Sequence, residues 1–87
     1  QVVGTVVERD DNWLTIDVKN KFAVGDQLEL INPAGNLRFS ANKMENRKGE
    51  AMEYAPGSGH VVHIPKPDNL PESLAFSYLT RILPENN

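Results

Sequence analysis

The chain has 87 residues, a net charge of −3 and no cysteine, which limits it to one domain, residues 1–87, with one small core. Without cysteine it has no disulfide, thiolate metal site or cysteine nucleophile, as is common in cytoplasmic proteins. No apolar run approaches the roughly 20 residues of a membrane span, so we expect no membrane partner. Since the chain begins at Gln1 rather than at methionine, we expect it to be a piece of a longer protein.

The first 19 residues predict two strands. Residues 2–8 are rich in valine, which favours a strand with apolar side chains on both faces, covered on two sides. Residues 9–12 form a polar turn. From Trp13 to Lys19 polar and apolar residues alternate, which predicts a half-buried strand with Trp13 on its outward face or at its mouth.

A turn, a strand and a hairpin are predicted from Asn20 to Asn36. Gly25-Asp26 is typical of a turn. Residues 27–31 alternate, with the two leucines on one face. The sequence Pro-Ala-Gly-Asn at 33–36 has the residues of a tight turn. Residues 37–41 alternate again and are predicted to return as the second strand of the hairpin.

The remaining strands are shorter. Met44 is predicted to continue the preceding arm, 46–49 to turn and 50–53 to return as a short strand. Residues 56–59 form a loop, and 60–64 a strand that Pro65 ends.

The last segment leaves more than one prediction open. Pro71 can begin one helical turn. Residues 74–83 fit a helix or a strand, and we favour a closing strand over 77–82, because a barrel needs a partner for its first strand. Residues 85–87 are predicted to be a tail.

Six or seven short strands separated by turn residues predict an all-β fold, a small antiparallel β-barrel. The side chains assigned to its core are Phe22, Val24, Leu28, Leu30, Phe39 and Ile64.

Several separated motifs resemble the C-terminal domain of the collagenase-like peptidase family U32. They are NKFxVGDxLEL at 20–30, PxGN at 33–36, MENxKGEAM at 44–52 and APG at 55–57. The similarity extends from Gly4 to Arg81, and the branch it resembles most closely hydroxylates the wobble uridine of bacterial tRNA.

That resemblance implies a barrel like those of translation elongation factors, attached to an N-terminal catalytic domain of the same chain. In the hydroxylating members the resemblance implies an iron–sulfur cluster on cysteines and the use of prephenate, both in the catalytic domain. We expect no cofactor in this domain and carry no catalytic residue over to it. The parent is then expected to be an enzyme, acting in tRNA hydroxylation or as a peptidase, whereas this domain alone is not.

The residues themselves predict no catalytic or metal site. His60 and His63 are three apart in a strand, which places them on opposite faces and prevents them from sharing a metal ion. The pair Asp10 and Asp11 lacks a partnered base. Ser58 lies between glycines in a loop without the strand-to-helix elbow of a serine nucleophile.

The strongest candidate site is the basic middle of the chain. Residues 18–48 hold six cations against three acids. If the fold brings the cations together, they can bind an RNA phosphate backbone; otherwise they form a solvated face. Aromatic platforms for unpaired bases are also present. The predicted cations are Lys19, Lys21, Arg38, Lys43, Arg47 and Lys48, and the predicted stacking residues are Trp13 and Tyr54.

Two functions follow for this domain. In the first it is a non-catalytic barrel that helps to bind the tRNA substrate or docks on the catalytic domain. In the second it is a protein- or peptide-interaction barrel of a collagenase-like peptidase, which uses an exposed apolar face of Trp13, Val3 and Val7. In either case we expect the isolated domain to be a monomer. An independent enzyme of this size is a third reading.

Overall fold

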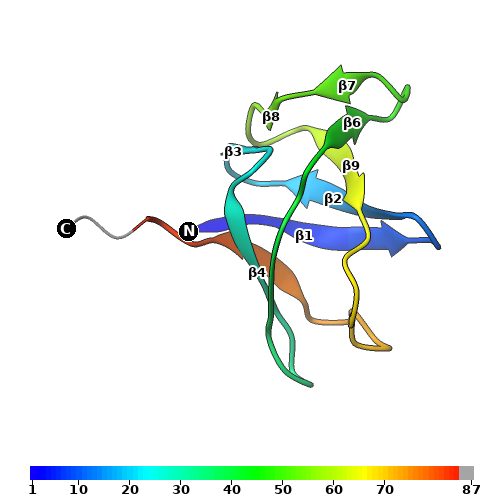
Figure 1. Ribbon diagram of the computed structural model, residues 1–87, viewed down its shortest axis with the longest axis vertical. Coiled ribbons are helices and arrows are strands. Elements are labelled where there is room, and N and C mark those ends of the chain that lie inside the picture. The colour runs from blue at the N-terminus through cyan, green and yellow to red at the C-terminus, as the bar shows by residue number, and fades with distance from the viewer. Residues whose placement is uncertain (85–87) are drawn as a thin grey trace.

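Ten strands make up the secondary structure of residues 1–84, the part of the chain that the computed structural model describes. Eight of them form one antiparallel sheet in the order β5-β4-β10-β1-β2-β9-β6-β7, and β3 pairs with β8. The large sheet curls into a half-barrel (Figure 1), which confirms the predicted all-β class. The strands are β1 (Val2–Arg9), β2 (Trp13–Val18), β3 (Phe22–Ala23), β4 (Gln27–Ile31), β5 (Leu37–Ser40), β6 (Met44–Asn46), β7 (Ala51–Met52), β8 (Tyr54–Ala55), β9 (Val61–Pro65) and β10 (Tyr78–Arg81).

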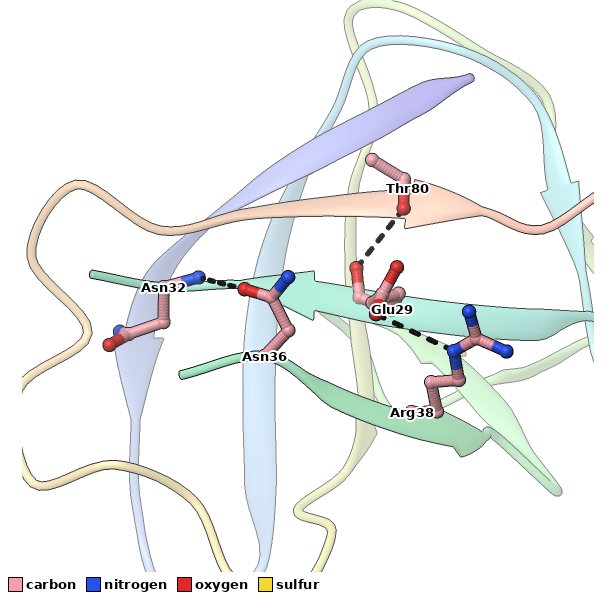
Figure 2. Close-up of polar contacts among 5 residues, drawn as sticks. All are labelled: Glu29, Asn32, Asn36, Arg38 and Thr80. Carbon is pink, nitrogen blue, oxygen red and sulfur yellow. Dashed lines mark hydrogen bonds and ion pairs between the residues drawn. The ribbon is translucent and has the colours of Figure 1, made fainter. Parts of the chain in front are cut away.

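β4 and β5 form the predicted hairpin. Leu28 faces Phe39 across it, so the alternation of both strands directs apolar side chains to the same side. At the turn, Asn36 Oδ1 accepts a hydrogen bond of 3.2 Å from the backbone amide of Asn32 (Figure 2). Side-chain amides of this kind stabilise tight turns by binding nearby backbone groups.

β10 is the closing strand predicted for residues 77–82. It lies between β1 and β4, with Thr80 opposite Val2 and Leu79 opposite Leu30. The choice between helix and strand is therefore decided by the neighbours, which supply backbone partners on both edges of β10.

The core lies on the concave side of the sheet. Four of the six predicted core residues are buried, namely Phe22, Leu28, Leu30 and Ile64. Val24 and Phe39 are partly buried and pack against it. Further buried apolar side chains are Val3, Leu14, Ile16, Val18, Ala41, Met44, Ala55, Val62 and Leu79.

The prediction that β1 is covered on both faces is wrong. Val3 is completely buried and Val6 packs against the core, but Val2 and Val7 are exposed. Two β-bulges in β1, between Val2 and Gly4 and between Val6 and Glu8, shift the alternation and turn these two valines outward.

Smaller differences concern short elements. β3, β7 and β8 have two residues each, too few to show alternation, and β7 is the short strand predicted for 50–53. The prediction that Met44 continues the preceding arm is wrong, because Met44 begins a separate strand, β6, which pairs with β7 and β9. Pro65 lies within β9 rather than after it, as its last residue, where a missing N–H is tolerated. No helical turn follows Pro71 within the described residues.

Residues 1–84 contain no helix that is long and apolar enough to cross a membrane. The tail predicted for residues 85–87 lies outside the described part of the chain.

Candidate nucleic-acid interface

The fold separates the six predicted cations. Lys19, just after β2, forms an ion pair of 3.1 Å with Asp17. Arg38, on the edge strand β5, pairs with Glu29 at 3.5 Å (Figure 2). Exposed ion pairs of this kind contribute little stability, but they neutralise the two cations locally.

Lys21 contacts the second predicted aromatic residue. Its ammonium lies 4.6 Å from the centroid of the Tyr54 ring, beside the small sheet of β3 and β8. Lys21 comes shortly after the last residue of β2, whereas Trp13 is the first residue of that strand. At the usual rise of a strand, the two ends of this segment are about 20 Å apart. The two predicted stacking residues therefore do not form one platform.

The other three cations flank β6: Lys43 precedes it, and Arg47 and Lys48 follow it in the turn to β7. β6 pairs with β9, which in turn pairs with β2. We call the exposed side of these three strands, together with the residues that flank β6 and β9, the β6–β9 surface. Its members are Trp13, Lys43, Arg47, Lys48, His60 and His63.

A tight turn before β2 fixes Trp13. The Asp10 carboxylate accepts hydrogen bonds from the backbone amides of Asn12 and Trp13, at 2.8 and 2.7 Å. These bonds favour the ionised form and hold the pKa of Asp10 below its ordinary value of 3.8, with a smaller contribution from the charges of His63 and Lys66. The first residue of β2 is thus held in a defined position.

Trp13 lies between a lysine and a histidine. The Lys43 ammonium is 5.2 Å from the centroid of the indole ring. The His63 imidazole is 6.3 Å from the same ring, centroid to centroid, at a tilt of 41°. Three separate strands or their ends supply these side chains, so the cluster depends on the pairing of the sheet.

Arg47 and Lys48 are presented by the turn between β6 and β7. Asn46 Oδ1 accepts hydrogen bonds from the amides of Lys48 and Glu50, at 2.9 and 3.0 Å. Gly49 adopts a φ of 81°, which closes the turn. The two cations therefore project from a fixed turn, and together with His60 they line a shallow groove.

The charges on the β6–β9 surface are only partly balanced. Glu45 faces His63 across the β6–β9 pair, and Glu50 accepts a hydrogen bond from the Asn46 side chain. Lys43, Arg47 and Lys48 are exposed and form no ion pair with a residue between 1 and 84. The surface therefore carries three cations against two acids, a small local excess of positive charge that can meet an anionic backbone.

His60 and His63 were not predicted for this site. The prediction that they lie on opposite faces of one strand is wrong, because His63 is in β9 whereas His60 precedes it. In the sequence each histidine had no predicted partner, and no local pattern relates them to Lys43 or Arg47. Only the register of β9 against β6 brings them beside these cations.

The apolar face of Trp13, Val3 and Val7 does not exist as predicted. Val3 is buried in the core, whereas Val7 is exposed, so the two valines do not share an exposed face with Trp13. Within residues 1–84, no three His, Cys, Asp or Glu side chains lie close enough together to hold a metal ion.

Two kinds of comparison identify the chain from its sequence. The profile of the peptidase family U32 C-terminal domain matches residues 1–76. The chain is 52% identical over 82 residues to tRNA hydroxylation protein P of Escherichia coli K12, which covers 93% of this chain and 18% of that protein. It is 40% identical over 89 residues to the protein of the same name from Haemophilus influenzae, covering all of this chain and 19% of that one. The chain thus spans about a fifth of these relatives.

The fold matches a solved structure as well. The crystal structure of the C-terminal domain of a Geobacillus thermoleovorans protein, assigned to the U32 peptidases, superimposes with a TM-score of 0.82. The match covers 95% of this chain and 93% of that one at 19% identity, so it speaks for the fold. Sequence and fold together confirm the resemblance seen in the motifs at 20–30 and 44–52: the chain belongs to the family of peptidase U32 C-terminal domains.

Proposed function

We propose that this domain is a non-catalytic part of a U32 protein that acts in tRNA hydroxylation, and that it helps to hold the tRNA through the β6–β9 surface. The observation that carries the proposal is the contact of the Lys43 ammonium with the Trp13 ring, with Arg47 and Lys48 exposed in the turn at the other end of the same strand, β6. The names of the two relatives supply the substrate class. Since the chain spans about a fifth of them, the activity of its parent is part of the proposal.

The interaction energies favour an exchange of partners at Trp13. A cation–π contact at an exposed site contributes about 0.5–1 kcal/mol, whereas a base stacked on an aromatic ring contributes about 1–3 kcal/mol. An unpaired base can therefore replace the Lys43 ammonium over the ring. Lys43 is then free to meet a phosphate of the same strand.

The binding is expected to be weak and sensitive to salt. The chain as a whole has a net charge of −3, so attraction to RNA arises only locally. If three cations each neutralise one phosphate of a single strand, the logarithm of the binding constant falls with the logarithm of the salt concentration with a slope of about −2.

The chemistry is proposed to lie elsewhere in the parent. A cysteine-ligated iron–sulfur cluster does not fit this chain, which has no cysteine, so the cluster and the prephenate site implied by the resemblance are expected outside these 87 residues. A protein that modifies tRNA is expected in the cytoplasm, where tRNA is used.

Two double variants of equal charge change test the proposal in the full parent protein. Arg47→Gln with Lys48→Gln removes two cations of the β6–β9 surface, and Lys19→Gln with Arg38→Gln removes two ion-paired cations away from it. We expect the first pair to weaken tRNA binding and to reduce the salt slope by about 1–2. The second pair should change neither.

NMR of the labelled 87-residue domain with a tRNA anticodon stem-loop locates the contact. The chemical-shift changes caused by the RNA should be largest at Trp13, residues 43–48 and His63, and should become smaller as salt is added. Equal effects of the two double variants, or shifts that ignore salt, would refute the RNA-binding proposal and favour a protein-interaction barrel.

A further inference from the structure

The outer side of β1 and β10 carries a stripe of apolar side chains that the described chain covers only in part. Val2, Val7 and Tyr78 are 41%, 50% and 38% exposed. Tyr78 lies opposite Thr5 on β1, and Thr80 lies opposite Val2, so these side chains share one face of two interior strands. We call Val2, Val7, Phe76 and Tyr78 the outer stripe.

Phe76 is the most exposed member. Its side chain is 91% exposed, and its backbone has a φ of 60°. A bulky residue rarely adopts this left-handed conformation, which costs on the order of 1–3 kcal/mol and is often found at functional sites. The residue is therefore held outward in a conformation that the isolated domain does not need for its own core.

Hydrogen bonds from distant elements fix the segment that leads to Phe76. The Arg9 guanidinium donates to the backbone carbonyls of Pro71 and Glu72, at 2.8 and 3.1 Å. The Asn32 amide donates to the Ser73 carbonyl and to the Ser77 hydroxyl. Of these, the bond to Ser77, at 2.6 Å, is buried. The presentation of Phe76 is thus built into the fold rather than left to a free loop.

The apolar surface continues on both sides of Phe76. On one side a groove is lined by Pro33 and Ala34 of the β4–β5 turn together with Pro71 and Ala75. On the other, Val7 and Ala75 border a second hollow. Both recesses also include an acidic side chain, Glu72 in the groove and Glu8 in the hollow, so the apolar residues near Phe76 come from three segments of the chain and alternate with polar ones.

Two of the charges next to the stripe are paired. Asp17, opposite Thr5, forms its ion pair with Lys19, and Glu29, opposite Thr80, forms its pair with Arg38. Glu8 and Glu72, in the recesses beside the stripe, form no ion pair within residues 1–84. Paired charges and acidic side chains suit a protein partner better than a nucleic acid, which binds unpaired cations.

We propose that the outer stripe is the docking site for the part of the parent chain that precedes Gln1. That polypeptide is attached at Gln1, the residue before Val2 of the stripe, and backbone hydrogen bonds between Gln1 and Arg81 hold this junction at the end of β1 and β10 (Figure 1). The matched relatives are about five times as long as this chain, so the occupant is large and covalently attached.

A second copy of the domain is a poorer partner for this surface. β1 and β10 are interior strands of the sheet, so they have no free edge with which to pair. A covalently attached partner is also present at a high effective concentration, whereas a second copy is not. The proposal depends on the family and not on RNA binding, and the two can fail separately.

Hydroxyl-radical footprinting tests the proposal on the native sequence. The oxidation rates of Phe76, Tyr78 and Tyr54 are compared in the full parent protein and in the 87-residue domain, whose Geobacillus counterpart was crystallised as a domain alone. Tyr54 is the internal control, since it is 49% exposed and lies on β8, which pairs with neither β1 nor β10. We expect Phe76 and Tyr78 to oxidise at least threefold more slowly in the parent, and Tyr54 to be unchanged.

Equal rates in both proteins would overturn the proposal. So would rates at Phe76 and Tyr78 that fall as the concentration of the isolated domain rises, because this outcome assigns the stripe to a second copy. A matched pair of variants adds a second measurement: in the parent, Tyr78→Ser should expose Phe76 to faster oxidation, whereas Tyr54→Ser should not. The same rate at Phe76 in both variants would contradict the docking.

Discussion

The Lys43 ammonium lies over the indole ring of Trp13, 5.2 Å from its centroid, although 29 residues separate the two in the chain. β9 lies between their strands and brings them together. The contact joins a cation and an aromatic ring, the two kinds of group that bind a single strand of nucleic acid.

Replacing Trp13 should separate the contribution of base stacking to tRNA affinity from the contribution of the cations. We expect Trp13→Ala in the full parent to weaken tRNA binding about fivefold or more, because a base stacked on an aromatic ring contributes about 1–3 kcal/mol. Trp13→Phe keeps a smaller ring and should retain most of the affinity. Filter binding at fixed salt measures both, and an affinity for Trp13→Ala equal to that of the wild type would exclude stacking at this position.

Gly4 should be intolerant of any side chain. A Cβ atom at this position would lie 2.6 Å from the backbone oxygen of Asp17 and 2.7 Å from Cγ2 of Ile16. We expect Gly4→Ala to lower the free energy of unfolding by about 1–3 kcal/mol or more, as overpacking does in other cores. Urea denaturation of the isolated domain measures it.

Gly25 provides the control for this substitution. Its φ is +90°, but a Cβ there would meet no atom within 4 Å. Gly25→Ala should therefore cost only the backbone strain, about 1 kcal/mol. If Gly4→Ala were the milder of the two, the close approach of β1 to β2 would have to be wrong.

Asp10 should make stability depend on pH in the acid range. Hydrogen bonds from the amides of Asn12 and Trp13 lower the pKa of Asp10 in the folded state below 3.8. Its contribution to stability is then present above the unfolded pKa and is lost as the pH falls through the folded one. The urea midpoint of the wild type should fall more steeply than that of Asp10→Asn between roughly pH 5 and pH 2.

Asp10→Asn serves as the comparison because its amide oxygen can still accept both backbone bonds, while its charge no longer titrates. Every other carboxylate is common to the two proteins, so their difference isolates Asp10. Parallel curves over this pH range would show that the turn gains nothing from the ionised carboxylate.

Much of the fold was predictable because alternation is local. Leu28 and Leu30 identified β4 and its inward face, and the tight-turn residues at 33–36 located the hairpin. The closing strand followed from the need of β1 for a partner, and β10 fills that place. The family, too, was recognisable from motifs that mostly form turns and core, since these positions allow few residue types.

The candidate site was predictable only in its components. The six cations could be read from the sequence. In the fold, however, Lys19 and Arg38 form ion pairs, whereas Arg47 and Lys48 project from a turn held by hydrogen bonds to Asn46. The local sequence does not distinguish paired from unpaired cations, because the environment of each cation depends on how its segment is placed in the folded sheet.

By itself, then, the sequence determined the β class, the hairpin and the family, all of which depend on short-range pattern. Only the tertiary structure decided that Lys43 meets Trp13 and that Val2 and Val7 face outward while Val3 is buried. The physical reason is the same in each case. Strand register and β-bulges are set by the packing of segments far apart in the chain, and a bulge of one residue reverses which face a side chain occupies.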